Sequence, residues 1–222
     1  MTLGIKSDRY QIYKPLKQLS ATSHDANHIR YLTSCEKEAI DFDKVKDVYH
    51  DSSGHNGHYL TSADALAFIK NHHVFIEFKS GTVKGQTKSN VCMKMRDSLL
   101  IYCDIEQKYF SYVRENVDFI LVYDQKSNDK SIKHYIKNAK CCTSNDCGVA
   151  YNEERTSTDE YVGQPGKYSY SKNSIGKHLA SLAGGTFKLF GLGFYEGVLY
   201  KNVYTFNEEE FNEFINEFDT LI

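Results

Sequence analysis

Apolar residues recur along the first 140 residues at spacings that predict alternating helices and strands. Near-helical spacing predicts a helix over 31–49. Two apolar runs joined by the polar turn Lys70-Asn71-His72 predict a β-hairpin over about 65–79. An apolar stripe at positions 92, 95, 99 and 102 predicts a helix over about 89–106. A buried strand is expected over 117–123, because this run is rich in β-branched and aromatic residues.

The remainder of the chain has a less regular pattern. A helix is predicted over about 130–140, and the polar, glycine-containing stretch 141–172 predicts a long loop or partly mobile insertion. A short helix near 174–183 and a glycine-punctuated strand region over 187–206 are expected next. Asn207 is the predicted N-cap of a final helix, with three glutamates in its first turn. The predicted buried face of that helix consists of Phe211, Phe214, Ile215 and Phe218.

The order helix, hairpin, helix, strand predicts an α/β fold in which helices flank a mixed β-sheet. A length of 222 residues allows one sizeable core. We expect a single domain over 1–222, with a core over about 31–140. An additional α+β region over about 141–222 is expected to pack on this core.

Composition narrows the class of protein. A net charge of −2 disfavours broad non-specific binding to nucleic acid, although it leaves room for a local basic surface. No apolar run reaches the length of a membrane span, about 18 residues, and the first residues lack the apolar segment of a signal peptide. Without such a signal, the six cysteines are most simply reduced thiols, which predicts a cytoplasmic protein.

Three charged residues stand out beside the predicted hairpin. Asp64 opens the first strand, and Glu77 and Lys79 close a second strand that is otherwise apolar, although Glu and Lys are poor strand formers. Residues two apart share a strand face, so Glu77 and Lys79 point the same way as Phe75, and the hairpin brings Asp64 across from them. Two such carboxylates suit Mg²⁺ or Mn²⁺, with the Phe78 carbonyl as a further oxygen ligand. Lys79 could then stabilise charge that builds up on a phosphate.

Over about 35–125, this layout resembles the PD-(D/E)xK nuclease superfamily, whose core is helix, three strands, helix, strand. The resemblance implies a restriction-endonuclease-like fold and Mg²⁺-dependent hydrolysis of DNA phosphodiester bonds. It implies Asp64, Glu77 and Lys79 as catalytic residues, with Asp64, Glu77 and Phe78 at the metal. It also implies that the following helix docks DNA through four basic residues, namely Lys84, Lys88, Lys94 and Arg96.

One position departs from the family pattern, and one residue of that pattern has two candidates here. Ala63 stands where the family's name has proline. Several relatives add a glutamate from the first helix, for which Glu36 and Glu38 are both candidates. The main alternative function is a catalytically inactive nuclease-fold module that binds other molecules. A third interpretation is an unrelated α/β domain in which Asp64 is a turn or cap residue and Glu77 and Lys79 form cross-strand ion pairs.

Weaker patterns favour structural interpretations over functional ones. A polar loop is favoured over a transition-metal site for His50, Asp51, His55 and His58. Reduced thiols are favoured over a zinc site for Cys141, Cys142 and Cys147 with His134. For the glycines of 191–197, turns are favoured over a phosphate-binding loop. For the aromatic residues of 194–206, a core or interface role is favoured over base stacking. The final helix is most simply packed on the core, and homodimerisation through it stays open.

Overall fold

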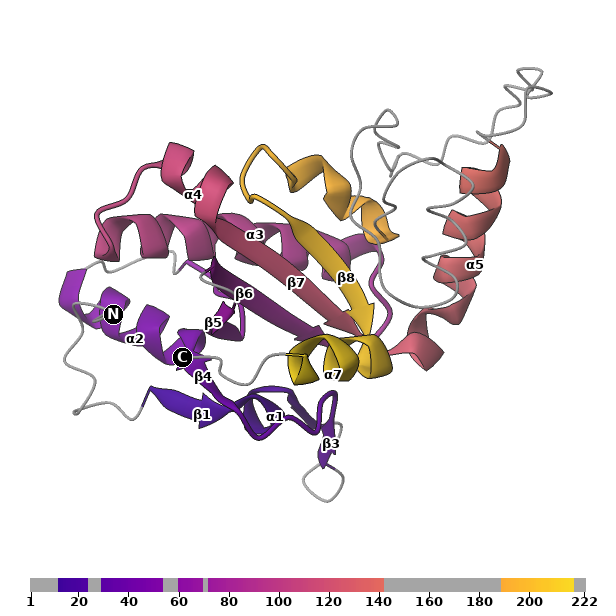
Figure 1. The fold of residues 1–222 in the computed structure, drawn as a ribbon, viewed down its shortest axis with the longest axis horizontal. Helices are drawn as coiled ribbons and strands as arrows, with labels where there is room; N and C mark the ends of the chain where they lie inside the picture. Colours follow the sequence, from indigo (N-terminus) through magenta and orange to yellow (C-terminus); the bar gives the residue numbers. More distant parts are fainter. Residues whose placement is uncertain (1–11, 24–28, 54–59, 70–71, 142–188, 218–222) are drawn as a thin grey trace.

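The computed structural model describes residues 12–23, 29–53, 60–69, 72–141 and 189–217. Its main feature is a six-stranded mixed sheet in the order β1-β4-β5-β6-β7-β8 (Figure 1). The strands are β1 Tyr13–Pro15, β4 Glu38–Asp41, β5 Ala65–Ile69, β6 His72–Lys79, β7 Val117–Tyr123 and β8 Val203–Asn207. Neighbouring strands are antiparallel from β1 to β6 and parallel from β6 to β8. A separate two-stranded sheet pairs β2 Ala21–Ser23 with β3 Ile29–Tyr31. The α/β class with a mixed sheet is thus as predicted.

Helices pack on both faces of the six-stranded sheet. They are α1 Leu16–Leu19, α2 Phe42–Ser53, α3 Gly85–Ile105, α4 Phe110–Asn116, α5 Gln125–Cys141, the 3-10 helix η2 Leu189–Tyr195 and α7 Glu208–Asn216. One core cluster joins α2, α3 and α4 to a face of the sheet that includes Phe75 and Phe119. The second cluster joins α1 and α7 to the opposite face, which includes Ile76 and Phe78. The two clusters explain why every residue of β7 is buried, as its apolar composition predicts.

The predicted hairpin is confirmed. Strands β5 and β6 are antiparallel, with Ala65 opposite Ile76 and Ile69 opposite His72. His72 therefore belongs to β6, while residues 70 and 71 of the expected turn lie outside the described residues. After β6, the chain forms α3 and α4 and returns as β7, parallel to β6. This connection places α3 over the face of β6 that carries Phe75.

The helix expected over 31–49 is wrong in its first half. Residues 38–41 form β4, which pairs with both β1 and β5, so tertiary pairing overrides helical spacing there. Helix α2 begins only at Phe42, immediately after β4 ends. Asp41 explains this start, because its Oδ1 accepts a hydrogen bond from the Lys44 backbone N–H at 3.2 Å, as an N-cap residue does. The helix then extends to Ser53, into the segment expected to be a loop.

The C-terminal region matches its prediction in part. The strand region expected over 187–206 contains η2 and the strand β8, and the left-handed residues Phe190 and Gly191, with φ of 60° and 68°, interrupt its first half. Strand β8 extends the main sheet, and α7 follows with the predicted cap. Asn207 accepts a hydrogen bond from the Glu210 N–H at 2.9 Å, and Glu210 accepts one from the Asn207 N–H at 2.7 Å. The loop and short helix expected within 142–188, and Phe218, lie outside the described residues.

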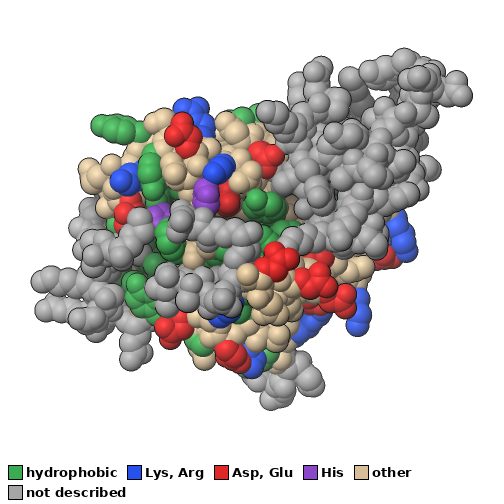
Figure 2. All heavy atoms as spheres, in the orientation of Figure 1, with side chains coloured by type: hydrophobic (Ala, Val, Ile, Leu, Met, Phe, Trp, Pro, Cys, Tyr) green, Lys and Arg blue, Asp and Glu red, His purple; other side chains and the backbone are tan. Residues whose placement is uncertain are grey.

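Surface charge is mixed on the face shown in Figure 2, where acidic side chains gather over α7. The described residues of that face therefore carry both signs of charge. Among the described residues, no helix has the length and apolar character needed to cross a membrane.

Candidate active site

Asp64 and Glu77 converge at one end of the hairpin, as their positions on neighbouring strands predict. Asp64 precedes β5, and its Oδ2 accepts a hydrogen bond from the Phe78 backbone N–H at 2.7 Å. Lys94 Nζ lies 2.9 Å from Asp64 Oδ1 and 2.9 Å from Glu77 Oε1. These two carboxylate oxygens are therefore separated by no more than twice that distance.

Lys79 completes the group by forming an ion pair with Glu77 Oε1. We call Asp64, Glu77, Lys79 and Lys94 the carboxylate–lysine cluster. The Glu77 side chain is fully buried, whereas the other three side chains each keep about a fifth of their surface exposed, between 19% and 22%. A ligand can therefore reach the cluster through Asp64 and the two lysines, with Glu77 beneath them.

Strand alternation and helix packing explain why these side chains meet. Glu77 follows Phe75 by two residues, and Phe75 packs in the same core cluster as Val91 and Met95 of α3. Glu77 therefore faces α3, where Lys94 lies beside Met95. The two buried apolar residues hold the helix against the strand, and the Lys94 stem carries its ammonium group to the carboxylates.

The same face of α3 also holds the segment before Asp64. Asp97 and Ser98 follow Lys94 by three and four residues, so the three side chains are neighbours on the helix. Asp97 accepts hydrogen bonds from the backbone N–H and the hydroxyl of Thr61, both at 2.9 Å. The Ser98 hydroxyl accepts one from the Ala63 N–H at 2.7 Å. The sequence pattern did not single out Asp97 or Ser98, although their spacing from Lys94 offered a signal.

Electrostatics within the cluster follow from its burial. Burial raises the pKa of Glu77 to about 7, and the Asp64 carboxylate adds to the rise, whereas Lys94 and Lys79 oppose it. Burial alone would lower the pKa of Lys94, but Glu77 and Asp64 outweigh it and hold that pKa above its ordinary value. Lys94 is therefore a charged ammonium group at neutral pH.

The buried Glu77 Oε1 atom lies within ion-pair distance of both lysine ammonium groups. Oxygen ligands of this kind suit Mg²⁺, which binds proteins through one or two carboxylates and keeps waters and phosphate oxygens. The donor chemistry of Asp64 and Glu77 thus fits such an ion. Among the described residues, no group of three His, Cys, Asp or Glu side chains is placed to hold a metal.

A cavity of about 390 Å³ adjoins the cluster on the Asp64 side. Asp64 and Phe78 form part of its wall, and the remaining lining residues are Gln18, Leu19, Ala21, Thr22, Asp41, Asp43, Lys44 and Asp47. Each of its four aspartates pairs with a lysine: Asp41 with Lys14, Asp43 and Asp47 with Lys46, and Asp64 with Lys94. Asp43 and Asp47 of α2 line this cavity together with Asp64.

The two glutamates expected to supply a first-helix acid lie elsewhere. Glu36 precedes β4 and pairs with Lys17 at 2.6 Å on the surface, and Glu38 is an exposed residue of β4. Neither belongs to a helix, because the expected helix begins later in the chain. Phe78 meets Asp64 through its backbone N–H, while the expected role of its carbonyl group stays a prediction.

The four basic residues expected to contact DNA do not form one group. Lys94 belongs to the carboxylate–lysine cluster and is about four-fifths buried. Lys84 is exposed at the start of α3, Lys88 is half-buried in its first turns, and Arg96 is exposed, with its Nε donating to the Cys92 carbonyl at 3.3 Å. Lys84, Lys88 and Arg96 therefore remain candidates for a surface role, whereas Lys94 has an internal one.

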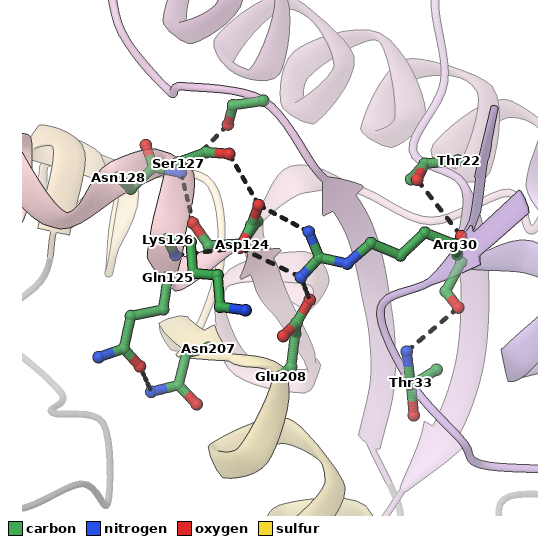
Figure 3. A network of polar contacts seen from close by, with 12 residues as sticks. Thr22, Arg30, Thr33, Asp124, Gln125, Lys126, Ser127, Asn128, Asn207 and Glu208 are labelled. Atoms are coloured by element: carbon green, nitrogen blue, oxygen red, sulfur yellow. Dashed lines mark hydrogen bonds and ion pairs between the residues drawn. The ribbon is translucent and has the colours of Figure 1, made fainter. Parts of the chain in front are cut away.

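Asp124 and Asn128, which Figure 3 shows within a larger polar network, hold the chain where β6 ends, directly after Lys79. The Asp124 N–H donates to the Lys79 carbonyl at 2.9 Å, and Asn128 binds the Val83 N–H at 2.7 Å and the Gly81 carbonyl at 3.1 Å. This network therefore fixes both β6 and the segment that leads from it into α3. Asp124 has the sequence position of an N-cap for α5, but no local pattern indicates these contacts.

Arg30 of β3 joins this network from a distant part of the chain. Its guanidinium donates two hydrogen bonds to Asp124, at 2.8 and 3.2 Å, and forms an ion pair with Glu208 at the start of α7. Burial alone would raise the pKa of Asp124, but hydrogen bonds from Arg30 and Ser127 hold that pKa below its ordinary value. Arg30 thus ties the small sheet of β2 and β3 to the strand ends beside the candidate site.

Residues of the weaker sequence patterns have structural roles in the part of the chain that the structure describes. His50 and Asp51 lie in α2, and His50 Nε2 is 3.4 Å from the Leu60 carbonyl. Gly191 and Gly197 adopt left-handed conformations, with φ of 68° and 70°, as turn glycines do. Tyr200 is fully buried and donates to the Met95 carbonyl at 2.8 Å. His55, His58, Cys142 and Cys147 lie outside the described residues, and the side chains of His134 and Cys141 are also not described.

Comparison with protein-family models, with curated proteins and with solved structures finds no match for this chain. Functional inference therefore depends on the geometry and chemistry of the carboxylate–lysine cluster.

Proposed function

We propose that this chain is a metal-dependent nuclease of the PD-(D/E)xK type that hydrolyses DNA phosphodiester bonds. The convergence of Asp64 and Glu77, with Lys79 paired to Glu77 on the same strand, carries the proposal. The depth of Glu77 and the partial exposure of the other cluster residues support a site that admits a phosphate from one side.

The topology around the cluster supports the proposal. The order α2, β5, β6, α3, β7 supplies a helix, two strands, a helix and a strand, where the expected core has three strands after its first helix, and β6 and β7 are parallel. One difference is that β4, the neighbour of β5 in the sheet, comes before α2 in the chain. The carboxyl ends of parallel strands are common ligand sites in open α/β sheets, and the cluster lies near that end of β6.

In the proposed reaction, Asp64 and Glu77 would hold Mg²⁺ or Mn²⁺ together with the substrate. A metal bound there supplies Lewis acidity toward the scissile phosphate and lowers the pKa of a bound water. The hydrogen bond from Phe78 fixes the orientation of the Asp64 carboxylate. The Lys79 ammonium group would stabilise negative charge on the phosphate. Three basic residues would contact the nucleic-acid backbone: Lys84, directly before α3, and Lys88 and Arg96 within that helix.

A second candidate function is a nuclease-fold module that binds its partner without cleaving it. The charge balance of the cluster favours this alternative, because two ammonium groups already face two carboxylates. Such a cluster can be a stable structural ion-pair network without any metal. The two candidates differ in whether a divalent cation produces cleavage.

Cleavage assays separate the two functions. The full chain is incubated with supercoiled plasmid, linear duplex and single-stranded DNA, with Mg²⁺, with Mn²⁺ or with chelator. The variant Glu77→Gln removes the buried carboxylate, and Glu115→Gln is the matched control because Glu115 is exposed on α4. We expect metal-dependent cleavage by the wild type and the control, and its loss in Glu77→Gln. DNA binding without cleavage under every condition would support the binding module instead.

A further inference from the structure

Lys94 stands out within the cluster because it contacts both carboxylates. Its Nζ lies 2.9 Å from Asp64 Oδ1 and 2.9 and 3.0 Å from the two oxygens of Glu77. Lys79 contacts Glu77 alone. The Lys94 ammonium group thus lies between the two side chains that are proposed to hold a divalent cation.

A divalent ion and the Lys94 ammonium group would compete for the same position between the two carboxylates. Mg²⁺ binds oxygen at about 2.1 Å, so an ion shared by Asp64 and Glu77 would come close to the present position of Lys94 Nζ. Two positive charges at such separation repel strongly at a site with little water. A divalent ion therefore cannot bind both carboxylates while Lys94 keeps its position.

We propose that Lys94 is the resident cation of the Asp64–Glu77 pair and that a divalent ion binds by displacing it. This inference rests on the proposed metal-dependent function. In the free protein, the ammonium group holds the two carboxylates together and neutralises their repulsion. When the metal enters, Lys94 moves toward solvent, where a substrate phosphate provides its new partner.

The surroundings of Lys94 allow its side chain to move while the helix stays in place. Val91 and Met95 are fully buried, and Asp97 and Ser98 bind the 61–63 segment, so α3 is fixed on both sides of Lys94. Lys94 itself keeps 20% of its side chain exposed, and lysine has four rotatable stem bonds. Exchange therefore requires rotamer changes of one side chain rather than movement of the backbone.

Metal titration by calorimetry tests the exchange directly. Mn²⁺ is titrated into the wild type, Lys94→Gln and Lys133→Gln, a control that removes an exposed lysine of α5. We expect Lys94→Gln to bind Mn²⁺ about tenfold more tightly than the wild type, a difference of about 1.4 kcal/mol, and the control to match the wild type. Equal affinity in all three proteins would overturn the exchange while leaving a metal site. Absence of Mn²⁺ binding in all three would contradict the metal-dependent function itself.

A second measurement uses the wild type alone and therefore does not depend on whether Lys94→Gln folds. Lysine side-chain NMR of the wild type is followed during titration with Mg²⁺. The Lys94 ammonium signal is expected to move toward that of a solvated lysine as the metal binds. A Lys94 signal that stays unchanged at metal saturation would overturn the proposal.

Discussion

The Phe78 backbone N–H donates a 2.7 Å hydrogen bond to Asp64 Oδ2, which ties the start of β5 to the end of β6. This contact leaves Asp64 Oδ1 for Lys94 or a metal. It therefore orients a functional carboxylate by means of the strand that carries Glu77 and Lys79.

Substitution of Asp64 tests the contribution of this hydrogen bond to stability. Asp64→Ala removes the acceptor for the Phe78 N–H and one carboxylate from Lys94, so we expect a loss of about 1–3 kcal/mol in the free energy of unfolding. Asp64→Asn keeps an acceptor oxygen and should lose less. Urea denaturation measures both variants. Equal losses would show that the hydrogen bond contributes nothing to stability.

Ser98 is predicted to be a positioning residue for Asp64. Ser98 and Ala63 are fully buried, so Ser98→Ala leaves the Ala63 N–H without its acceptor and should cost about 1–3 kcal/mol. The variant should also lower any metal-dependent cleavage, because Asp64 directly follows Ala63. Ser89→Ala, an exposed serine earlier in α3, is the control. Unchanged cleavage and stability in Ser98→Ala would remove this role.

His73 should make the fold sensitive to acid. Burial lowers its pKa to about 4, and Lys108 and His72 add to the effect. The folded state therefore binds fewer protons than the unfolded state between pH 4 and pH 6.5. The stability that neutral His73 contributes is full above about pH 6.5 and is lost as the pH falls toward 4, at up to about 1.4 kcal/mol per pKa unit.

Urea denaturation at pH 7 and pH 4.5 measures this effect. The difference in unfolding free energy between the two pH values should be smaller in His73→Phe than in the wild type. The variant should also be less stable at pH 7, because the Tyr102 hydroxyl loses its hydrogen bond to His73. An NMR titration that places the His73 pKa near 6.5 would contradict the prediction.

Arg30 should stabilise the strand ends around Asp124. Arg30→Ala removes two hydrogen bonds to Asp124, and we expect a loss of about 1–2 kcal/mol, because the Arg30 side chain is 40% exposed. The pKa of Asp124 should rise in the variant. Hydrogen exchange should become faster in β3 and at the start of α5 and α7. Arg30→Lys should restore only part of the stability, because lysine cannot form the paired contact.

Local sequence patterns predicted those parts of the fold that depend on neighbouring residues. The hairpin, the strand β7 and the cap of α7 follow from apolar alternation, β-branched composition and Asn207 with its following glutamates. The convergence of Asp64 and Glu77 was also predictable, because strand pairing has a fixed register.

Features that depend on distant contacts were not predictable in this way. Residues 38–41 show helical spacing, yet they form β4 because β1 and β5 pair with both of their sides. Lys94 was expected to contact DNA, and only the packing of α3 against β6 reveals its contact with Glu77. Arg30 reaches Asp124 across 94 positions of the chain. Such contacts need the whole fold.

The initial rate of plasmid cleavage at saturating Mg²⁺, in the wild type and in Glu77→Gln, tests the proposed function most directly. We expect chelator-sensitive cleavage by the wild type and a rate at least about 100-fold lower in the variant, equivalent to about 2.7 kcal/mol of activation free energy. Equal rates in the two proteins would contradict it.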